Sequence, residues 1–163
     1  MGEFSSVDEI LEFAIAREVE ANEFYKVLAG RVDNPAMRGL IQEFGKEELE
    51  HKAKLELELM KRGSVVTEPQ RASEAKKLAD FKIADYIVDT GELLHMEYED
   101  LLLLAMKKEK VSFRLYIELA SVIGDAESRE VLLSLAEEEA GHKVRFEVEY
   151  DDVVLKHKKE AEE

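Results

Sequence analysis

The sequence predicts an all-α fold, a four-helix bundle built from two similar helical hairpins that one long connection joins. Apolar residues recur every three or four positions along four long segments, which is the period of a helix with one buried face. Only two prolines occur among the 163 residues, so little interrupts these segments. The same pattern of Glu and His occurs twice, 91 residues apart, and this repeat indicates two equivalent halves. A chain of this length suits one core, so we expect residues 1–163 to form a single domain.

The composition excludes several classes of function. A net charge of -15 argues against nucleic acid or an anionic membrane surface as a partner, because both require basic patches. The absence of cysteine excludes disulfides, iron–sulfur clusters and thiolate zinc sites within this sequence. No apolar run approaches the roughly 18 residues of a membrane span, and the first residues do not have the pattern of a signal peptide. We therefore expect a cytoplasmic protein.

The first hairpin has recognisable helix ends. Ser6 and Glu9 have the spacing of a capping box, which predicts that the first helix begins at Ser6. The segment Asp-Asn-Pro at 33–35 ends this helix, and Asn34 with Pro35 forms a good N-cap and first-turn pair for the second. The second helix is expected to end near Gly63.

The second hairpin repeats this arrangement. Its first helix is expected to cover roughly Met96 to Ile123, with Phe113 in the core, as Phe24 is in the first hairpin. Asp125 is a candidate N-cap for the last helix. The final segment, KHKKEAEE, is polar on every side, and we expect it to fray.

The segment 64–95 between the hairpins is expected to be a crossover connection. It contains Pro69 and only a short apolar patch that could form one small helix. About 30 residues permit a return along the whole bundle, so the third helix would start at the end where the second started. Four-helix bundles with one such crossover form the ferritin-like class.

In the first hairpin, counting from the turn brings two carboxylates to one height. Glu18 lies fifteen residues before position 33, and Glu48 lies fifteen residues after it. At the helical rise of about 1.5 Å per residue, both lie about 22 Å from the turn. His51 follows Glu48 by three residues and therefore shares its face, one turn further along.

The second hairpin has the same geometry about its turn at position 124. Glu109 and Glu139 lie fifteen residues on either side of this position, and His142 follows Glu139 by three. Each Glu interrupts an otherwise apolar stripe, so packing the two hairpins together would bring six polar side chains to the middle of the bundle.

Four ionised carboxylates in a core repel one another and lose their hydration, which costs several kcal/mol each unless something compensates. Two divalent cations carry a charge of +4, which balances four Glu, and neutral imidazoles can supply further ligands. The sequence therefore predicts a site for two metal ions. The alternatives are a polar core network without metal, or a rotated arrangement in which Glu47 or Glu138 replaces its neighbour.

The segments EVEANEFY, EELEH, EKVSFRLY and EEEAGH resemble the ligand helices of the rubrerythrin branch of the ferritin-like di-iron carboxylate proteins. This arrangement, one Glu from each of two helices and Glu-x-x-His from the other two, is a known pattern of such bundles. The resemblance covers all four helices. It implies that Glu18 and Glu109 are single-Glu ligands, that the pairs Glu48–His51 and Glu139–His142 complete the set, and that one Glu of each pair bridges the metals.

Two tyrosines lie two turns beyond the single-Glu positions. Tyr25 and Tyr116 could donate hydrogen bonds to the ligand carboxylates from outside the ligand set, or could be ordinary core tyrosines. The family also has a further Glu one turn after the ligand of the third helix. Here Ser112 stands at that position and Ala21 at its equivalent in the first helix, and no four-cysteine rubredoxin-like tail occurs in this sequence.

Carboxylate and imidazole ligands suit iron, manganese or zinc. With iron, the resemblance implies an oxidoreductase that reduces peroxide or dioxygen, in which the metal ligands are the only catalytic groups and a separate rubredoxin-like protein donates electrons. Ferroxidase and iron storage of the ferritin type is an alternative, and a metal-stabilised interaction module without turnover is another. We expect a homodimer.

Overall fold

The computed structural model describes residues 4–63 and 96–162, which form four α-helices and contain no strand. The helices are α1 (Val7–Arg31), α2 (Pro35–Lys61), α4 (Tyr98–Val122) and α5 (Ala126–Glu162). The all-α prediction is confirmed. The crossover predicted for 64–95 lies outside the described residues. No helix in the described ranges combines the length and the apolar character that crossing a bilayer requires.

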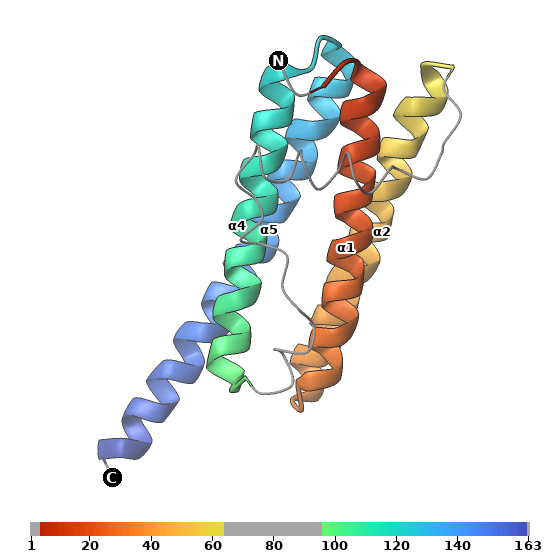
Figure 1. Ribbon diagram of the computed structural model, residues 1–163. Helices are drawn as coiled ribbons and strands as arrows, with labels where there is room; N and C mark the ends of the chain where they lie inside the picture. Colours follow the sequence, from red (N-terminus) through yellow and green to blue (C-terminus); the bar gives the residue numbers. More distant parts are fainter. Residues whose placement is uncertain (1–3, 64–95, 163) are drawn as a thin grey trace.

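The four helices form two antiparallel hairpins that lie side by side (Figure 1). Helix α1 packs closely along α2, and α4 packs closely along α5. Helices α2 and α4 begin at the same end of the bundle, where Met37 and Leu101 belong to one apolar cluster. At this end Arg31 donates a hydrogen bond from Nη2 to the carbonyl of Met96, at 2.9 Å. The starting point predicted for the third helix is therefore confirmed.

The first helix begins where the sequence predicted, although its cap is only half of the expected box. The Ser6 hydroxyl accepts a hydrogen bond from the Glu9 amide at 3.1 Å, which stabilises an amide that has no partner within the helix. In a full capping box the Glu9 carboxylate would bond the amide of Ser6. It instead accepts from the amide of Ser5, one residue earlier.

Three further predicted helix ends, at Asn34, Gly63 and Asp125, are confirmed. Asn34 accepts a hydrogen bond from the amide of Met37 at 3.0 Å, and Asp125 accepts one from the amide of Ser128 at 2.9 Å. After α2, Gly63 adopts a positive φ of 81°, a backbone conformation that glycine adopts without strain.

Two expectations for the second hairpin are wrong. Phe113 was expected in the core but is 36% exposed. The face of α4 that packs toward α5 includes Val111 and Leu115, and this rotation of the helix leaves Phe113 at the edge of the core. The C-terminal segment was expected to fray, but α5 remains helical to Glu162 and extends past the end of the bundle (Figure 1). Lys, Glu and Ala favour the helix even without a packing partner.

The core consists of two apolar clusters with a polar layer between them. One cluster, near the start of α1, includes Ile10, Leu59 and Leu119, and the other includes Leu28 and Phe146. We call the residues between them the polar layer: Glu18, Glu48, His51, Glu109, Glu139 and His142. Every helix contributes to this layer, so the fold places it at the centre of the bundle.

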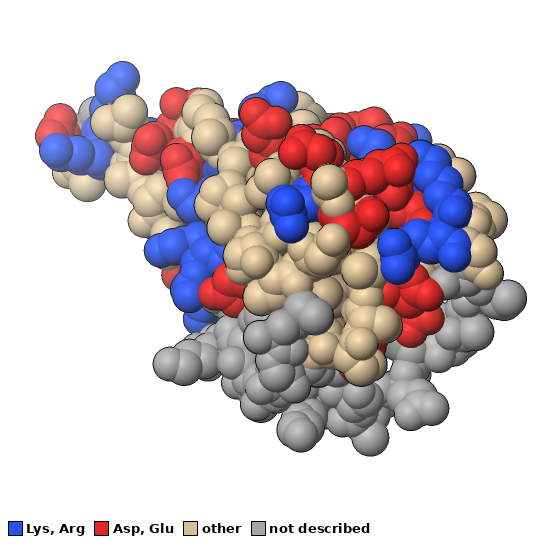
Figure 2. All heavy atoms as spheres, turned by 90° about the horizontal axis from the view of Figure 1, so that it is seen from above, with Lys and Arg blue, Asp and Glu red and all other residues tan. Residues whose placement is uncertain are grey.

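The end of the bundle near the start of α1 is joined by surface ion pairs. Arg62 at the end of α2 lies 2.8 Å from Asp8 of α1, and Lys61 lies 3.1 Å from Glu127 of α5. Figure 2 shows this end from above, with a group of Asp and Glu side chains on one part of it and Lys and Arg side chains beside them. Among the residues that the structure describes, the Lys and Arg side chains on this face lie close to Asp and Glu side chains.

A buried hydrogen bond joins α1 to α2 one turn beyond Glu18. The Asn22 amide donates to the backbone carbonyl of Gly45 at 2.8 Å, and both residues are buried. We expect Asn22→Ala to lower the stability by about 1 kcal/mol, and hence the melting temperature by about 3 °C, because one buried hydrogen bond is lost. Thermal unfolding followed by circular dichroism measures this. Glu23→Ala, at the exposed neighbouring position, is the control, and an equal melting temperature for both variants would contradict the assignment.

Candidate metal centre

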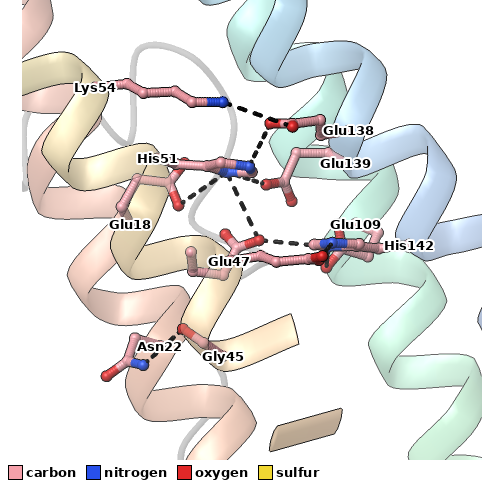
Figure 3. A network of polar contacts seen from close by, with 11 residues as sticks. Glu18, Asn22, Gly45, Glu47, His51, Lys54, Glu109, Glu138, Glu139 and His142 are labelled. Atoms are coloured by element: carbon pink, nitrogen blue, oxygen red, sulfur yellow. Dashed lines mark hydrogen bonds and ion pairs between the residues drawn. The ribbon is translucent and has the colours of Figure 1, made fainter. Parts of the chain in front are cut away.

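The structure brings all six predicted ligands together in the polar layer (Figure 3). None of the six is more than 6% exposed, although all are polar or charged. Helices α1 and α4 each contribute one carboxylate, and α2 and α5 each contribute a Glu-x-x-His pair. Equal spacing from the two turns therefore predicted the height of these residues correctly.

The potential ligand atoms form two overlapping groups, and the atoms of each group lie within 4.8 Å of one another. The first group contains Glu18 and His51, the second contains Glu109 and His142, and both contain Glu48 and Glu139. Two groups that share two carboxylates fit two neighbouring cations with Glu48 and Glu139 between them. The family resemblance implied that one Glu of each pair bridges the metals, and that role of Glu48 and Glu139 stays a prediction.

Both imidazoles turn the same nitrogen toward the carboxylates. The Nδ1 atom of His51 lies 2.9 Å from Glu139 Oε1 and 3.5 Å from Glu18 Oε2. The Nδ1 atom of His142 lies 3.4 Å from Glu48 Oε1. The two rings are almost parallel, with an angle of 9° between their planes and centroids 6.3 Å apart. Both histidines therefore present one nitrogen to the centre of the layer.

The outer nitrogens of the same rings contact two further carboxylates, whose role the sequence reasoning missed. The Nε2 atom of His51 lies 2.7 Å from Glu138 Oε2, and the Nε2 atom of His142 is hydrogen-bonded to Glu47. The alternative in which Glu47 or Glu138 replaces its neighbour in the ligand set is therefore not the observed arrangement. Their shared 91-residue spacing was the available signal, but it could not show which side chains they contact.

The polar layer contains buried atoms that make no hydrogen bond with the described residues. Each of the six side chains has at least one: Glu18 Oε2, Glu48 Oε1, His51 Nδ1, Glu109 Oε2, both oxygens of Glu139, and His142 Nδ1. Buried polar atoms without partners are rare in proteins because they are costly. All these atoms are of the kinds that coordinate divalent cations, so the residues fit a pair of metal ions.

When no cation is bound, the surroundings of the polar layer favour the protonated forms of its carboxyl and imidazole groups. Burial, followed by the charge of neighbouring carboxylates, raises the pKa of Glu48 to about 7 and the pKa of Glu139 to about 8. The same causes raise the pKa of Glu18 well above its ordinary value. Burial opposes the protonation of His142, yet the nearby carboxylates of Glu109 and Glu48 raise its pKa to about 11. A metal ion must therefore displace protons when it binds.

Aromatic rings form an apolar wall beside the polar layer. The Phe44 ring stacks on the ring of His142, with centroids 4.1 Å apart, and Tyr25 stacks against Phe146 at 6.1 Å. The hydroxyls of Tyr25 and Tyr116 are buried and make no hydrogen bond with the described residues. The structure therefore shows no hydrogen bond from either hydroxyl to a ligand carboxylate. Hydrogen bonding of these tyrosines to the ligands stays a prediction, and an ordinary core role is the alternative.

The two positions that depart from the family pattern lie outside both groups. Ala21 is buried and Ser112 is partly buried, and neither offers a carboxylate. Of the two remaining histidines, His157 is exposed and contacts Glu99, while His95 lies outside the described residues.

Comparison with known proteins agrees with the geometry. A family model described as Rubrerythrin matches residues 9–150, a range that contains the whole polar layer. A solved structure of a hypothetical protein from Pyrococcus furiosus is 28% identical in sequence and has a TM-score of 0.66. The match covers 93% of this chain and 91% of that one. A search of curated proteins found no significant match.

Proposed function

Because this chain belongs to the rubrerythrin family, we propose that its polar layer binds two iron ions and that the protein reduces peroxide or dioxygen. The observation that carries the proposal is the pair of overlapping groups of buried ligand atoms that share Glu48 and Glu139. A lone Glu-x-x-His pair in a Glu-rich helix would support much less, since most such pairs lie on a solvated face.

The charges of the polar layer support a pair of divalent cations. Four ionised Glu carry -4, two divalent cations carry +4, and the two imidazoles coordinate as neutral groups. Metal pairs in proteins lie about 3.5–4 Å apart, a spacing that lets one small molecule contact both ions. Oxygen and nitrogen ligands suit iron, manganese and zinc alike, and the redox chemistry proposed here requires iron or manganese rather than zinc.

When bound, two ferrous ions supply the two electrons that cleavage of an O–O bond requires. The overall reaction consumes peroxide, two electrons and two protons and yields two water molecules. The side chains of the polar layer hold the ions and exclude bulk water, since none of them is more than 6% exposed. We propose that a separate donor, such as a rubredoxin-like protein, returns the electrons.

The test is to load the purified protein with ferrous iron under anaerobic conditions and then to add peroxide. We expect two irons per chain, a change in absorbance on oxidation, and consumption of peroxide. Protein that binds iron but neither consumes peroxide nor changes its absorbance would overturn the proposed activity.

A variant of one unshared ligand tests the assignment of the site. Glu109→Ala should weaken the binding of at least one cation, because Glu109 belongs to only one of the two groups. Metal content measured by mass spectrometry should fall toward one ion per chain. Glu50→Ala, at an exposed position of α2, should leave two ions. Equal metal content in the Glu109 variant and the parent protein would count against the assignment.

A further inference from the structure

We propose that Arg17 and Lys108 form a binding site for a small inorganic anion, on the side of the metal centre where α1 and α4 meet. The ligands are monovalent anions, and the hydroperoxide ion is the member of this class that concerns the proposed reaction. The inference rests on the proposed binding of two metal ions and adds the charge of the ligand that the centre prefers.

The two cations occupy equivalent positions of the internal repeat. Arg17 directly precedes Glu18 on α1, and Lys108 directly precedes Glu109 on α4. They are 91 residues apart, as are the two Glu residues that follow them. Each hairpin therefore places one cation next to a carboxylate that belongs to only one of the two groups of ligand atoms.

Both cations lie over aromatic rings. The Cζ atom of Arg17 is 5.0 Å from the centroid of the Phe13 ring, and the Arg17 side chain is only 10% exposed. Lys108 is partly buried and reaches across from α4 to α1, where its Nζ atom is 5.1 Å from the centroid of the Phe24 ring. A ring face attracts a cation, so these contacts hold both charges at defined positions.

The charges on this side of the metal centre do not cancel. Arg17 forms an ion pair with Glu20, with 3.1 Å between Nη1 and Oε1. Lys108 forms no ion pair with the residues that the structure describes. Burial lowers the pKa of Lys108, and the nearby charges of Glu20 and Glu48 oppose this effect. Two cations and one carboxylate leave a net charge of +1.

The opposite side of the metal centre has the opposite charge. Helices α2 and α5 form that side, across the bundle from α1 and α4 (Figure 1). There Glu47 and Glu138 contact the outer nitrogens of the two histidines, and Lys54 lies 3.6 Å from Glu138 Oε1. Two carboxylates and one cation leave a net charge of -1. An anion is therefore attracted to the α1–α4 side and repelled from the α2–α5 side.

The size of the effect follows from the charges. Four ionised Glu and two divalent cations cancel, so the groups beside the metal centre decide its preference for an anion. The interaction of two unit charges about 7 Å apart corresponds to about 3-fold in affinity at the dielectric constant of water, and to about 50-fold at an effective value of about 20. Lys108 is partly buried and lies between these limits, so we expect its charge to contribute about 10-fold.

The experiment compares an anionic with a neutral probe on the full chain, loaded with two iron(II) ions under anaerobic conditions. Azide is the anion, and its binding is followed by near-infrared magnetic circular dichroism. Nitric oxide is the neutral probe, and its binding is followed by visible absorbance. Mass spectrometry checks that every variant holds two irons. A change in charge should alter the affinity for azide alone, whereas a distorted metal centre should alter both affinities.

Three substitutions change the charge of the proposed site. Lys108→Met should bind azide about 10-fold more weakly, and Lys108→Arg should bind it as the parent protein does. Glu20→Gln should bind azide about 3-fold more tightly, because it removes the carboxylate that offsets the charge of Arg17. The affinity for nitric oxide should stay the same in all three variants.

The exposed neighbour of Lys108 provides the matched control. Lys107→Met removes the same charge from the same helix, and its affinity for azide should stay within about 2-fold of the parent value, because solvent screens an exposed charge. Iron-loaded parent protein that does not bind azide would overturn the inference. So would a Lys108→Met variant that binds azide like the parent protein, or that binds both probes more weakly.

The same titrations separate this inference from the proposed activity. Parent protein that binds azide with the expected dependence on Lys108 but does not consume peroxide would overturn only the proposed activity. Protein that consumes peroxide but binds azide equally well with and without the charge of Lys108 would overturn only the anion site.

Discussion

Glu139→Gln is expected to abolish tight binding of the metal pair and, at the same time, to raise the melting temperature of the metal-free protein. Glu139 belongs to both groups of ligand atoms, so its loss should weaken both cations, by more than about 100-fold. In the metal-free protein, the same carboxylate destabilises the folded state. It is 1% exposed, and burial followed by the charge of Glu109 raises its pKa to about 8. A neutral amide of the same shape removes this cost.

The gain in stability of Glu139→Gln should be largest at pH values at which Glu139 of the parent protein is ionised. Thermal unfolding of metal-free protein at pH 8 should show a melting temperature about 5 °C above that of the parent protein, and a smaller difference at pH 5. Mass spectrometry measures the metal content and so tests the predicted loss of tight metal binding. Glu137→Gln, an exposed change on the same helix, should alter neither property. A metal-free Glu139→Gln protein that is less stable than its parent at pH 8 would contradict this account of the polar layer.

The stability of the metal-free protein is expected to fall as the pH rises from about 5 to 8. The pKa values of Glu48 and Glu139 are about 7 and 8 in the folded protein, above the ordinary value of 4.5. The folded state therefore binds more protons than the unfolded state in this range, and the free energy of unfolding decreases with pH. The raised pKa of His142 acts in the same direction above its ordinary value of 6.5.

Bound metal should remove this dependence, because the cations take the place of the protons. In the presence of a chelator we expect the melting temperature to be lower by about 5 °C at pH 8 than at pH 5. Protein loaded with two divalent cations should lose no stability over the same range, and calorimetry in buffers of different ionisation enthalpy should detect protons released on binding. A melting temperature that rises with pH in the chelated protein would show that the carboxylates are not buried together.

The height of each ligand along the bundle was predictable from the sequence. The rise per residue of a helix is constant, so equal counts from the turns at 33 and 124 place Glu18 level with Glu48 and Glu109 level with Glu139. The 91-residue repeat then required the two hairpins to match. The caps predicted at Ser6, Asn34 and Asp125 were also correct, for a different reason. A helix cap involves only residues that are neighbours in the sequence.

The rotation of each helix about its own axis was less predictable. Phe113 and Asn22 occupy equivalent positions of the repeat, yet Phe113 is partly exposed while Asn22 is buried against Gly45. A local apolar pattern defines a broad stripe rather than one angle. The final angle depends on how α4 packs against α5, which the residues of α4 alone do not specify.

The sequence by itself determined the four helices, the capped ends at Ser6, Asn34 and Asp125, and the depth at which the six side chains of the polar layer would meet, because caps are local and depth follows from counting along regular helices. Only the tertiary structure decided that both rings point Nδ1 inward, that Glu48 and Glu139 are shared, and that Glu47 and Glu138 reach across to the opposite histidines. The physical reason is that these contacts join hairpins distant in sequence, and their geometry depends on the packing angle and the side-chain rotamers rather than on any local period.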